Sequence, residues 1–268
     1  MPEMPEVEQV RKTLLPHIKG KKINKVDVFL PRLIQHPTAD IFEKKLKGRT
    51  ILDVGRRGKY LLLQTDKGTL VVHLRMTGAL VVSEEEPPYA KVKFALSDKL
   101  NLWFTDIRTF GTLYYVDDDF EIKGLATLGP EPLSKELTVD YLFPLAQKSR
   151  KPVKTFILDQ TIIAGLGNIY ADEALFLAGI KPTRLACEVK KQEVPKLIDA
   201  INQVISQGIK NRGTTFRDYK DGEGKKGNNQ NFLMVYSRGG KPCKKCGSIL
   251  EKTKVGGRGT VYCPKCQK

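Results

Sequence analysis

Two Cys-x-x-Cys pairs near the end of the chain constrain its fold more than any other feature. Cys243 and Cys246 form the first pair, Cys263 and Cys266 form the second, and sixteen residues separate the pairs. This spacing is typical of a zinc site with four thiolate ligands. The alternative, two disulfides, requires an oxidising compartment, and the opening residues show no basic and apolar secretion signal. We therefore expect one structural Zn²⁺, whose four thiolates leave no open coordination position.

The residues between the two pairs predict a β-hairpin. Residues 248–254 and 260–262 favour strands, and the glycine-rich stretch 255–259 between them carries Arg258. Residues 241–268 contain eight basic side chains and one acidic side chain, a formal charge of +7. Four thiolates on one zinc remove about two of these charges. The hairpin is therefore expected to contact a polyanion such as nucleic acid.

The charge of the whole chain points to the same class of partner. The 268 residues include 46 basic and 30 acidic side chains, a formal charge of +16, which favours nucleic acid or an anionic surface. No apolar run approaches the ~18 residues that span a bilayer, so a membrane protein is not expected. The length suits one large or two medium domains. We expect a cytoplasmic protein.

The apolar pattern predicts an α+β fold. A first helix presents Val7, Val10, Leu14 and Ile18 on one face, and Pro16 is expected to kink or shorten its last turn. A β-sandwich or barrel and then a helical half should follow. Strands are expected at 23–30, 60–64, 69–74, 79–82, 91–96, 101–104 and 111–115, and helices at 40–46, 139–147, 153–158, 168–178 and 192–209.

A tight turn with two glycines precedes one of the predicted helices. Gly165 and Gly167 form the turn, and Asn168 is expected at the N-cap. Free backbone N–H groups and the helix dipole make such a turn a seat for phosphate. An ordinary helix–turn–helix corner, whose glycines only permit close packing, fits the same spacing. The spacing alone leaves both interpretations open.

Several short motifs, taken together and in order, resemble the bacterial formamidopyrimidine-DNA glycosylases, members of the helix–two-turn–helix family. The motifs are Pro2-Glu3 with residues 5–8, Arg57-Gly58-Lys59, residues 73–76, Asp106-Ile107-Arg108 with Phe110-Gly111, residues 165–170, and Arg258. The resemblance implies three domains: an N-terminal β-sandwich catalytic domain (1–130), a helical helix–two-turn–helix domain with a lesion-capping loop (131–240) and a zinc-finger hairpin (241–268).

The resemblance also implies an activity. It is that of a bifunctional DNA glycosylase and abasic-site lyase of base-excision repair, which removes 8-oxoguanine and formamidopyrimidines from duplex DNA and cleaves the strand by β,δ-elimination. The implied enzyme is a monomer that acts on bacterial nucleoid DNA. Its partner is double-stranded DNA with an oxidised base, and its cofactor is one structural zinc.

The implied nucleophile is Pro2. Removal of Met1 would leave its secondary amine free, and an α-amino group titrates near ~8 against ~10.4 for lysine, so part of it is unprotonated at neutrality. The amine would form a Schiff base with the sugar, and Glu3 would move protons. Taken alone, proline and glutamate at a helix start are ordinary.

The family's phosphate contacts correspond to Lys59, His73, Asn168 and Arg258. Lys59 and Arg258 belong with the catalytic group, and Lys154 is a further DNA-binding residue. Isolated from the other motifs, Lys59 fits a solvated strand lysine and His73 a hydrogen-bonded histidine.

A flipped base leaves a gap in the duplex that side chains must fill. Met76, Arg108 and Phe110 correspond to the intercalating residues, with Arg108 facing the orphaned cytosine. Core packing is the alternative for Met76 and Phe110. The glycine- and asparagine-rich stretch 217–231 suits a mobile loop that closes over the base.

Three departures from the family pattern leave the substrate preference open. Residues 86–91, around Tyr89, lack the expected histidines, Thr109 stands where a basic residue is usual, and Val261 where a histidine is usual. Two alternative functions remain. One is an endonuclease-VIII-like glycosylase for oxidised pyrimidines, and the other is a catalytically inactive zinc-hairpin protein that binds DNA.

Overall fold

The computed structural model describes residues 2–268, and its contacts divide the chain into two compact units. Unit 1 consists of Met1–Leu125 and Ile209–Gln230, and unit 2 consists of Ala126–Gly208 and Asn231–Lys268. The chain therefore passes from one unit to the other three times, at residues 125–126, 208–209 and 230–231. No helix among residues 2–268 is both long and apolar enough to cross a bilayer.

Unit 1 begins with helix α1 (Met4–Ile18), which has Glu3 at its N-cap. Its predicted apolar face is confirmed, because the side chains of Val7, Val10, Leu14 and Ile18 are fully buried. Of the two effects expected of Pro16, a kink or a shortened last turn, the shortening is wrong, since α1 continues to Ile18. A proline this close to the end removes only its own backbone N–H from the hydrogen-bond ladder, and the last turn tolerates that loss.

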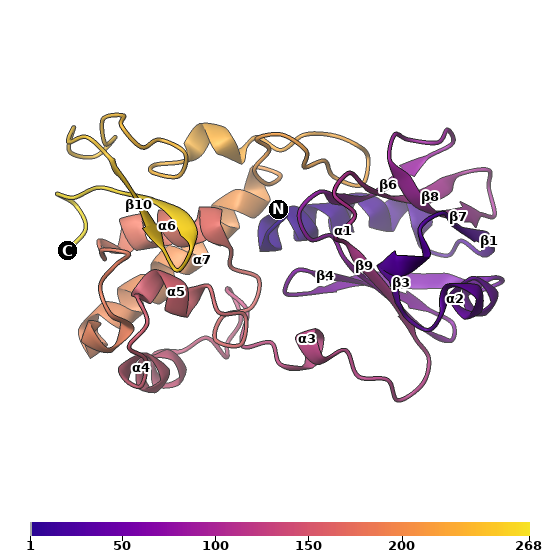
Figure 1. The fold of residues 1–268 in the computed structure, drawn as a ribbon, viewed down its shortest axis with the longest axis horizontal. Coiled ribbons are helices and arrows are strands. Elements are labelled where there is room, and N and C mark those ends of the chain that lie inside the picture. The colour runs from indigo at the N-terminus through magenta and orange to yellow at the C-terminus, as the bar shows by residue number, and fades with distance from the viewer. Residues whose placement is uncertain (1) are drawn as a thin grey trace. The chain divides into compact units, whose positions relative to one another are not determined.

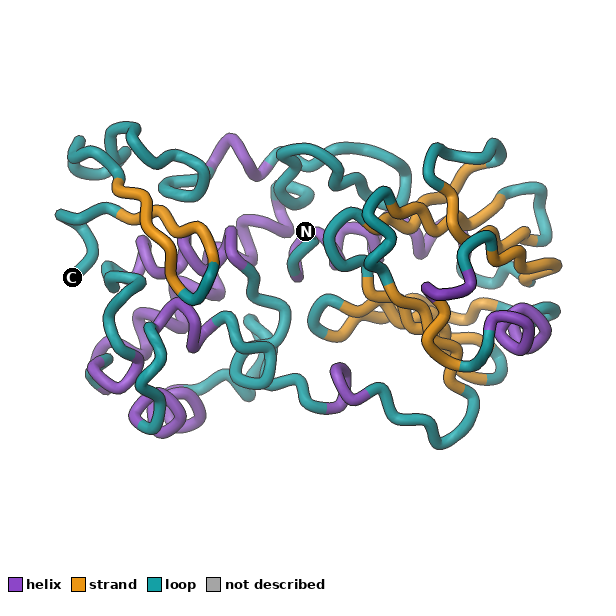
Figure 2. The backbone as a smooth tube through the Cα atoms, viewed as in Figure 1, coloured by secondary structure: helices purple, strands orange, loops and turns teal. Residues whose placement is uncertain are grey.

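Nine strands of unit 1 form two sheets, which appear as two layers of strands (Figures 1 and 2). One sheet has the order β1-β7-β8-β6 and the other β2-β9-β5-β4-β3; every pair is antiparallel except β2 with β9. The strands are β1 (Ile23–Val28), β2 (Ile34–His36), β3 (Ile51–Arg57), β4 (Tyr60–Thr65), β5 (Gly68–His73), β6 (Gly78–Ser83), β7 (Ala90–Leu96), β8 (Asn101–Asp106) and β9 (Thr112–Val116).

Both sheets bury their inner faces in one core. Leu61 and Leu113 from the five-stranded sheet belong to the same buried cluster as Phe94 and Phe104 from the four-stranded sheet. Residues of α1 and of α2 (Ala39–Leu46) complete this cluster. The shared core confirms the predicted β-sandwich.

Two strands of unit 1 were not predicted. β3 contains Asp53, Gly55 and two arginines and buries only Ile51 and Val54, so its sequence lacks the alternation of a typical half-buried strand. β2 is three residues long and ends beside Pro37, and a strand this short gives no detectable period.

Unit 2 is largely helical, as predicted. Its helices are α4 (Val139–Gln147), α5 (Val153–Ile157), α6 (Asn168–Ala178) and α7 (Val194–Lys210). The last residues of α7 belong to unit 1, and the short helix α3 (Lys123–Ala126) begins in unit 1 and ends in unit 2. Short 3₁₀ turns lie at Ala186–Glu188 and Lys191–Glu193 in unit 2, at Pro31–Leu33 in unit 1, and at Asn229–Phe232, where the chain passes from unit 1 to unit 2. Helix α6 is buried on nearly all sides, which identifies it as the central helix of unit 2.

The structure corrects the position of Asn168. The N-cap of α6 is Gly167, and Asn168 is the first helical residue. Gly165 has a φ of +86°, in the left-handed region, so the chain makes its sharp bend two residues earlier than the N-cap.

The zinc hairpin consists of β10 (Glu251–Val255) and β11 (Arg258–Tyr262), and β11 contacts α6 (Figure 1). Val255 pairs with Arg258, so the turn between the strands is Gly256-Gly257 alone. The φ angles of these glycines are +54° and +76°, as a two-residue type I′ turn requires. The expected five-residue tip, 255–259, is therefore wrong, because the strands continue further toward the turn.

Candidate catalytic residues and zinc centre

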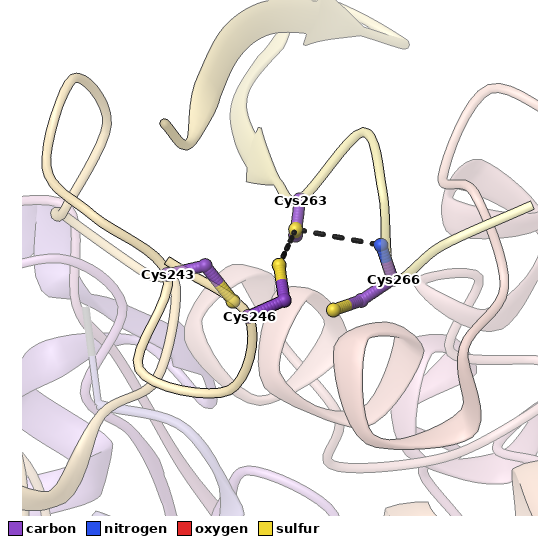
Figure 3. Close-up of side chains that lie close together, drawn as sticks. All are labelled: Cys243, Cys246, Cys263 and Cys266. Atoms are coloured by element: carbon purple, nitrogen blue, oxygen red, sulfur yellow. Dashed lines mark hydrogen bonds between the residues drawn. The ribbon is translucent and has the colours of Figure 1, made fainter. Parts of the chain in front are cut away.

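The four paired cysteines converge on one point. Their Sγ atoms all lie within 4.8 Å of one another, and Figure 3 shows the side chains directed toward a common centre. Cys246 Sγ and Cys263 Sγ are 3.5 Å apart, far beyond the ~2.05 Å of a disulfide bond, and all five cysteines are free. The predicted zinc ligands are thus together, and the disulfide alternative fails.

The backbone around the sulfurs fits a metal-bound thiolate. Lys245 N–H donates to Cys243 Sγ and Cys266 N–H donates to Cys263 Sγ, each at 3.4 Å, and Figure 3 marks the second of these bonds. Gly247, at a φ of +76°, turns the chain after the first pair. N–H donors to sulfur stabilise the thiolate form that binds metal. The site fits one structural Zn²⁺, which would hold the two ends of the hairpin together.

Pro2 and Glu3 are both buried at the start of α1. Glu3 N–H donates to Glu6 Oε2 at 2.8 Å, and Thr214 N–H donates to Glu6 Oε1 at 2.7 Å. The Glu6 carboxylate therefore ties the N-terminal residues to the 209–230 stretch of unit 1. Met1, whose removal would free the Pro2 amine, lies outside the described residues.

Lys59 lies in the two-residue turn between β3 and β4, after Gly58 at a φ of +55°. Arg56 donates to Gly58 O at 2.9 Å and to Glu8 on α1 at 3.2 Å. Burial raises the pKa of Glu8, but Arg11 and Arg56 outweigh it and hold that pKa below its ordinary value. The ionised Glu8 thus connects the turn that carries Lys59 to the helix that follows Glu3.

His73, at the end of β5, is buried and neutral. Burial, followed by the charges of Arg75 and Lys59, lowers the pKa of His73 to about 3. Its Nδ1 accepts Arg75 N–H at 3.0 Å, and its ring stands edge-on to the Tyr60 ring at 4.5 Å. Because Nδ1 is an acceptor, the ring proton resides on Nε2. His73 therefore presents an uncharged N–H donor at Nε2.

Asp106, fully buried at the end of β8, holds two loops of unit 1. Its Oδ1 accepts Thr77 Oγ1 at 2.5 Å and Arg108 N–H at 3.1 Å, and its Oδ2 accepts Gly111 N–H at 2.8 Å. One carboxylate thus fixes the loop after β5, which carries Met76, and the loop after β8. The sequence predicted no role for the Asp106 side chain, and its position two residues before Arg108 is the one feature that could have pointed to it.

The three residues expected to enter the duplex are exposed on these two loops. Met76 is 38% exposed and Phe110 is 51% exposed, which contradicts the core-packing alternative for both. The Arg108 guanidinium lies over the Phe110 ring, 4.8 Å from its centroid. The pair presents one cationic and one apolar group from the same loop.

In unit 2, the expected DNA contacts Asn168 and Lys154 meet at the hairpin. Asn168 Nδ2 and Lys154 Nζ each donate to Gly259 O at 3.0 Å, and Lys154 Nζ also donates to Thr260 Oγ1 at 2.8 Å. Lys154 is fully buried and pairs with Asp172 on α6 at 2.7 Å. This placement gives Lys154 a role inside unit 2, in positioning β11, and not at the surface.

Two neighbouring carboxylates of α6 bind the final part of the chain. Asp172 Oδ2 accepts Val261 N–H at 3.1 Å, and Glu173 accepts the N–H groups of residues 234–236 at 2.8–2.9 Å. Burial raises the pKa of Asp172 to about 6 against the opposing charge of Lys154. Burial likewise raises the pKa of Glu173, against the N–H donors. Asp172 and Glu173 were not predicted as functional residues, and the sequence signal for them is an acidic pair in an otherwise apolar helix.

The remaining expected residues lie at separate places in the two units. Arg258 is exposed as the first residue of β11, next to the glycine turn. Val261 packs against the cysteine cluster, so the position where a histidine was expected serves the hairpin core. Thr109 lies between Arg108 and Phe110 at a φ of +54°.

Known proteins are similar to this chain along nearly its whole length. Family models match in three consecutive parts: "Formamidopyrimidine-DNA glycosylase N-terminal domain" at residues 1–113, "Formamidopyrimidine-DNA glycosylase H2TH domain" at 128–220 and "Zinc finger found in FPG and IleRS" at 240–268. A formamidopyrimidine-DNA glycosylase of Pelotomaculum thermopropionicum is 48% identical over 274 residues, covering 100% of this chain and 99% of the relative. The chain belongs to the formamidopyrimidine-DNA glycosylase family.

Solved structures of the family agree with this membership. A complex of the Lactococcus lactis Fpg protein with DNA containing an abasic site matches with a TM-score of 0.93 and 35% identity, over 99% of both chains. The MutM (Fpg) protein of Thermus thermophilus matches with a TM-score of 0.91 and 38% identity, over 99% of this chain and 98% of the other. The zinc-finger match and the cysteine geometry together confirm the expected structural zinc site.

Proposed function

We propose that this chain is a bifunctional DNA glycosylase and abasic-site lyase that removes oxidised purines, namely 8-oxoguanine and formamidopyrimidines, from double-stranded DNA. Family membership supports this proposal, as do the DNA complexes of its structural relatives, which include one with Fapy-dG and one with an abasic site. The single observation in the chain that carries it is the fixed, buried Pro2-Glu3 pair at the start of α1.

In the proposed mechanism the Pro2 nitrogen attacks C1′ of the damaged nucleotide. The glycosidic bond breaks, its electron pair leaves with the base, and loss of the amine proton and opening of the sugar give an iminium ion. Glu3 carries protons at the sugar ring oxygen and during elimination. Breakage of the 3′ and then the 5′ C–O bond releases the two phosphate ends, and water returns the Pro2 amine.

The DNA contacts follow from the placement of the side chains. We assign phosphate contacts to Lys59, His73, Asn168 and Arg258, and to His73 the uncharged Nε2–H donor described above. Met76, Arg108 and Phe110 fill the gap left by the flipped base, with Arg108 facing the orphaned cytosine. Lys154 supports the contacts of Asn168 and Arg258 from within unit 2 by holding Gly259 and Thr260.

We further propose the organisation expected from the resemblance. The domains are 1–130, 131–240 and 241–268, supported by three family models that match in the same order. The stretch 217–231 caps the flipped base. The enzyme is a monomer that acts on nucleoid DNA in the bacterial cytoplasm, supported by its bacterial relatives and by four zinc-binding thiols, which persist in a reducing compartment.

Borohydride trapping on duplexes with 8-oxoguanine opposite cytosine tests the nucleophile. The wild-type protein should form a covalent adduct, and its intact mass should show that Met1 is absent. Pro2→Gly keeps an amine and should trap much more slowly. Glu3→Gln should bind the duplex but lose base excision by roughly 10²–10⁴-fold, since it lacks the proton carrier.

Two controls separate this proposal from its alternatives. Lys59→Ala should still form the trapped adduct at high protein concentration, because Lys59 only holds phosphate. If Lys59→Ala forms no adduct, while protein that retains Met1 still forms one, the nucleophile is Lys59 and not Pro2. A preference for thymine glycol over 8-oxoguanine would identify an endonuclease-VIII-like enzyme. Binding without any excision would identify an inactive zinc-hairpin protein.

A further inference from the structure

Arg32 reaches across unit 1 to the loop that carries Arg108 and Phe110. It lies in the 3₁₀ turn Pro31–Leu33 between β1 and β2 and is exposed to solvent. Its Nη1 donates to Thr109 O at 3.2 Å, and its Nη2 donates to Thr109 Oγ1. The guanidinium is therefore fixed to a residue 77 positions further along the chain.

The hydrogen bonds continue from Thr109 to Arg108. Thr109 Oγ1 accepts from Arg32 and donates to Arg108 O at 2.7 Å, so its single proton and one lone pair are both used. Thr109 has a φ of +54°, which a β-branched residue rarely adopts, and these bonds hold it there. The Arg32 guanidinium is thus part of the same rigid loop as the two expected intercalating residues.

The charge of Arg32 is not neutralised within the protein. Across residues 2–268, no carboxylate lies within ion-pair distance of its guanidinium. A guanidinium has five N–H donors, and the bonds to Thr109 use two of them. Three donors and a full positive charge therefore remain available beside Arg108, and this combination suits a phosphate.

We propose that Arg32 contacts a backbone phosphate of the strand opposite the lesion, as a fifth phosphate contact beside the four assigned above. The choice of strand rests on the proposed function, in which Arg108 faces the orphaned base. The Arg32 guanidinium comes from a turn distant in the sequence and supplies a positive charge next to Thr109, whose own side chain is an uncharged hydroxyl. Arg32 binds DNA directly in this assignment and is not merely a support for the loop.

The salt dependence of binding to an undamaged duplex tests the contact without any catalysis. A neutralised phosphate contributes about −0.9 to the slope of log affinity against log salt concentration, so Arg32→Ala should reduce the slope by about one. Lys25→Ala is the matched control, because Lys25 is exposed in the same unit but is already paired with Asp27 at 2.6 Å. Its slope should equal that of the wild type.

A second substitution distinguishes charge from loop support. Thr109→Lys in the Arg32→Ala background returns a cation to the loop without restoring the Arg32 bonds, and it should recover the lost unit of slope. An unchanged slope in Arg32→Ala overturns the proposal. So does a reduced slope that Thr109→Lys fails to restore, because Arg32 would then act only by holding the loop.

Failure of this inference is distinguishable from failure of the proposed function. Trapping by the wild-type protein reports on Pro2 and does not depend on Arg32. If the wild type is trapped on lesion DNA but Arg32→Ala has an unchanged salt slope, the proposed enzyme activity stands and the phosphate contact of Arg32 is wrong. If the slope of Arg32→Ala falls as expected but the wild type is never trapped, the phosphate contact stands and the proposed enzyme activity is wrong.

Discussion

Unit 1 and unit 2 hold their expected DNA contacts by different physical means. In unit 1, the buried Asp106 carboxylate fixes two loops by accepting hydrogen bonds from neutral N–H and O–H groups. In unit 2, the hairpin is held by a fully buried ion pair, Lys154 with Asp172, and by four cysteines. A charge that loses its partner in the interior costs more than a lost neutral hydrogen bond, so the two units should tolerate change differently.

The reason for the difference lies in the apolar core that each region has available. The loops of unit 1 are anchored in strands of a large sandwich whose core includes α1 and both sheets. The hairpin of unit 2 buries only a small cluster around Phe176, Val235 and Leu250, together with the cysteines themselves. A region with so little apolar burial depends on its metal to stay ordered, and it has little other stability to offset the loss of one partner of its buried ion pair.

The largest effect is expected from loss of the zinc site. Cys266→Ser should release the metal and disorder the hairpin, since structural zinc supplies on the order of 10 kcal/mol in small zinc domains. DNA binding should fall by more than roughly tenfold, because Arg258 loses its position. Metal analysis and binding assays measure both outcomes. Cys187→Ser, outside the cluster, is the control and should keep both the metal and the DNA binding. If Cys266→Ser destabilised unit 1 as much as the hairpin of unit 2, the two regions would not differ.

Asp172→Asn should have the next largest effect. It leaves the Lys154 ammonium buried without its counterion, which costs about 3–5 kcal/mol. Urea unfolding and the rate of zinc release measure the change in unit 2. The double variant Lys154→Met with Asp172→Asn removes both charges and should regain most of the stability. If the double variant is no better than the single one, the ion pair is not the cause.

Asp106→Asn should cost less, because its partners are neutral groups and the amide oxygen can still accept from Thr77 Oγ1 and Arg108 N–H, so that only Gly111 N–H loses its acceptor. The expected loss of unfolding free energy is about 1–3 kcal/mol. The discrimination in favour of cytosine opposite the lesion should fall more than the affinity for undamaged DNA, since the loop with Arg108 loses its anchor. A larger cost than that of Asp172→Asn would reverse the ranking of the two units.

The smallest effect concerns His73 and acid. Its pKa of about 3 in the fold lies below the ordinary 6.5, so the unfolded chain binds the proton first as the pH falls. The contribution of His73 is therefore complete above pH 6.5 and is lost toward pH 3. Between pH 7 and pH 6 the loss is about 0.7 kcal/mol. The denaturant midpoint of the wild type should therefore fall between pH 7 and pH 6, and the midpoint of His73→Gln, which lacks the titrating ring, should fall less.

The sequence predicted those parts of the molecule that depend on local pattern. Each Cys-x-x-Cys pair, the apolar face of α1 and the helix α6 depend on residues a few positions apart, and all are present. The features that the pattern missed depend on distant partners. Lys154 is buried because Gly259 and Asp172 lie around it, and Asp106 at the end of β8 holds Thr77 from the loop after β5.

Local chemistry explains the smaller corrections. The glycines at 256 and 257 could have belonged to a longer tip, and only the pairing of Val255 with Arg258 shows that they form the whole turn. Asn168 is a good N-cap residue, yet the N-cap is Gly167, one position earlier, and Asn168 is the first helical residue. Propensity identifies the region of a helix start more reliably than the residue.

The division of unit 1 between two separate stretches of chain determines when it can finish folding during synthesis. Glu6 Oε1 accepts Thr214 N–H, and Thr13 Oγ1 accepts Gly222 N–H, so α1 is completed by residues translated some 200 positions later. The ribosome must therefore make most of unit 2 before the start of the chain has all its partners. A gene fragment that stops at residue 125 would leave a buried Glu6 oxygen without its N–H donor. Excising unit 1 for separate production would require joining residues 209–230 to it through a new linker.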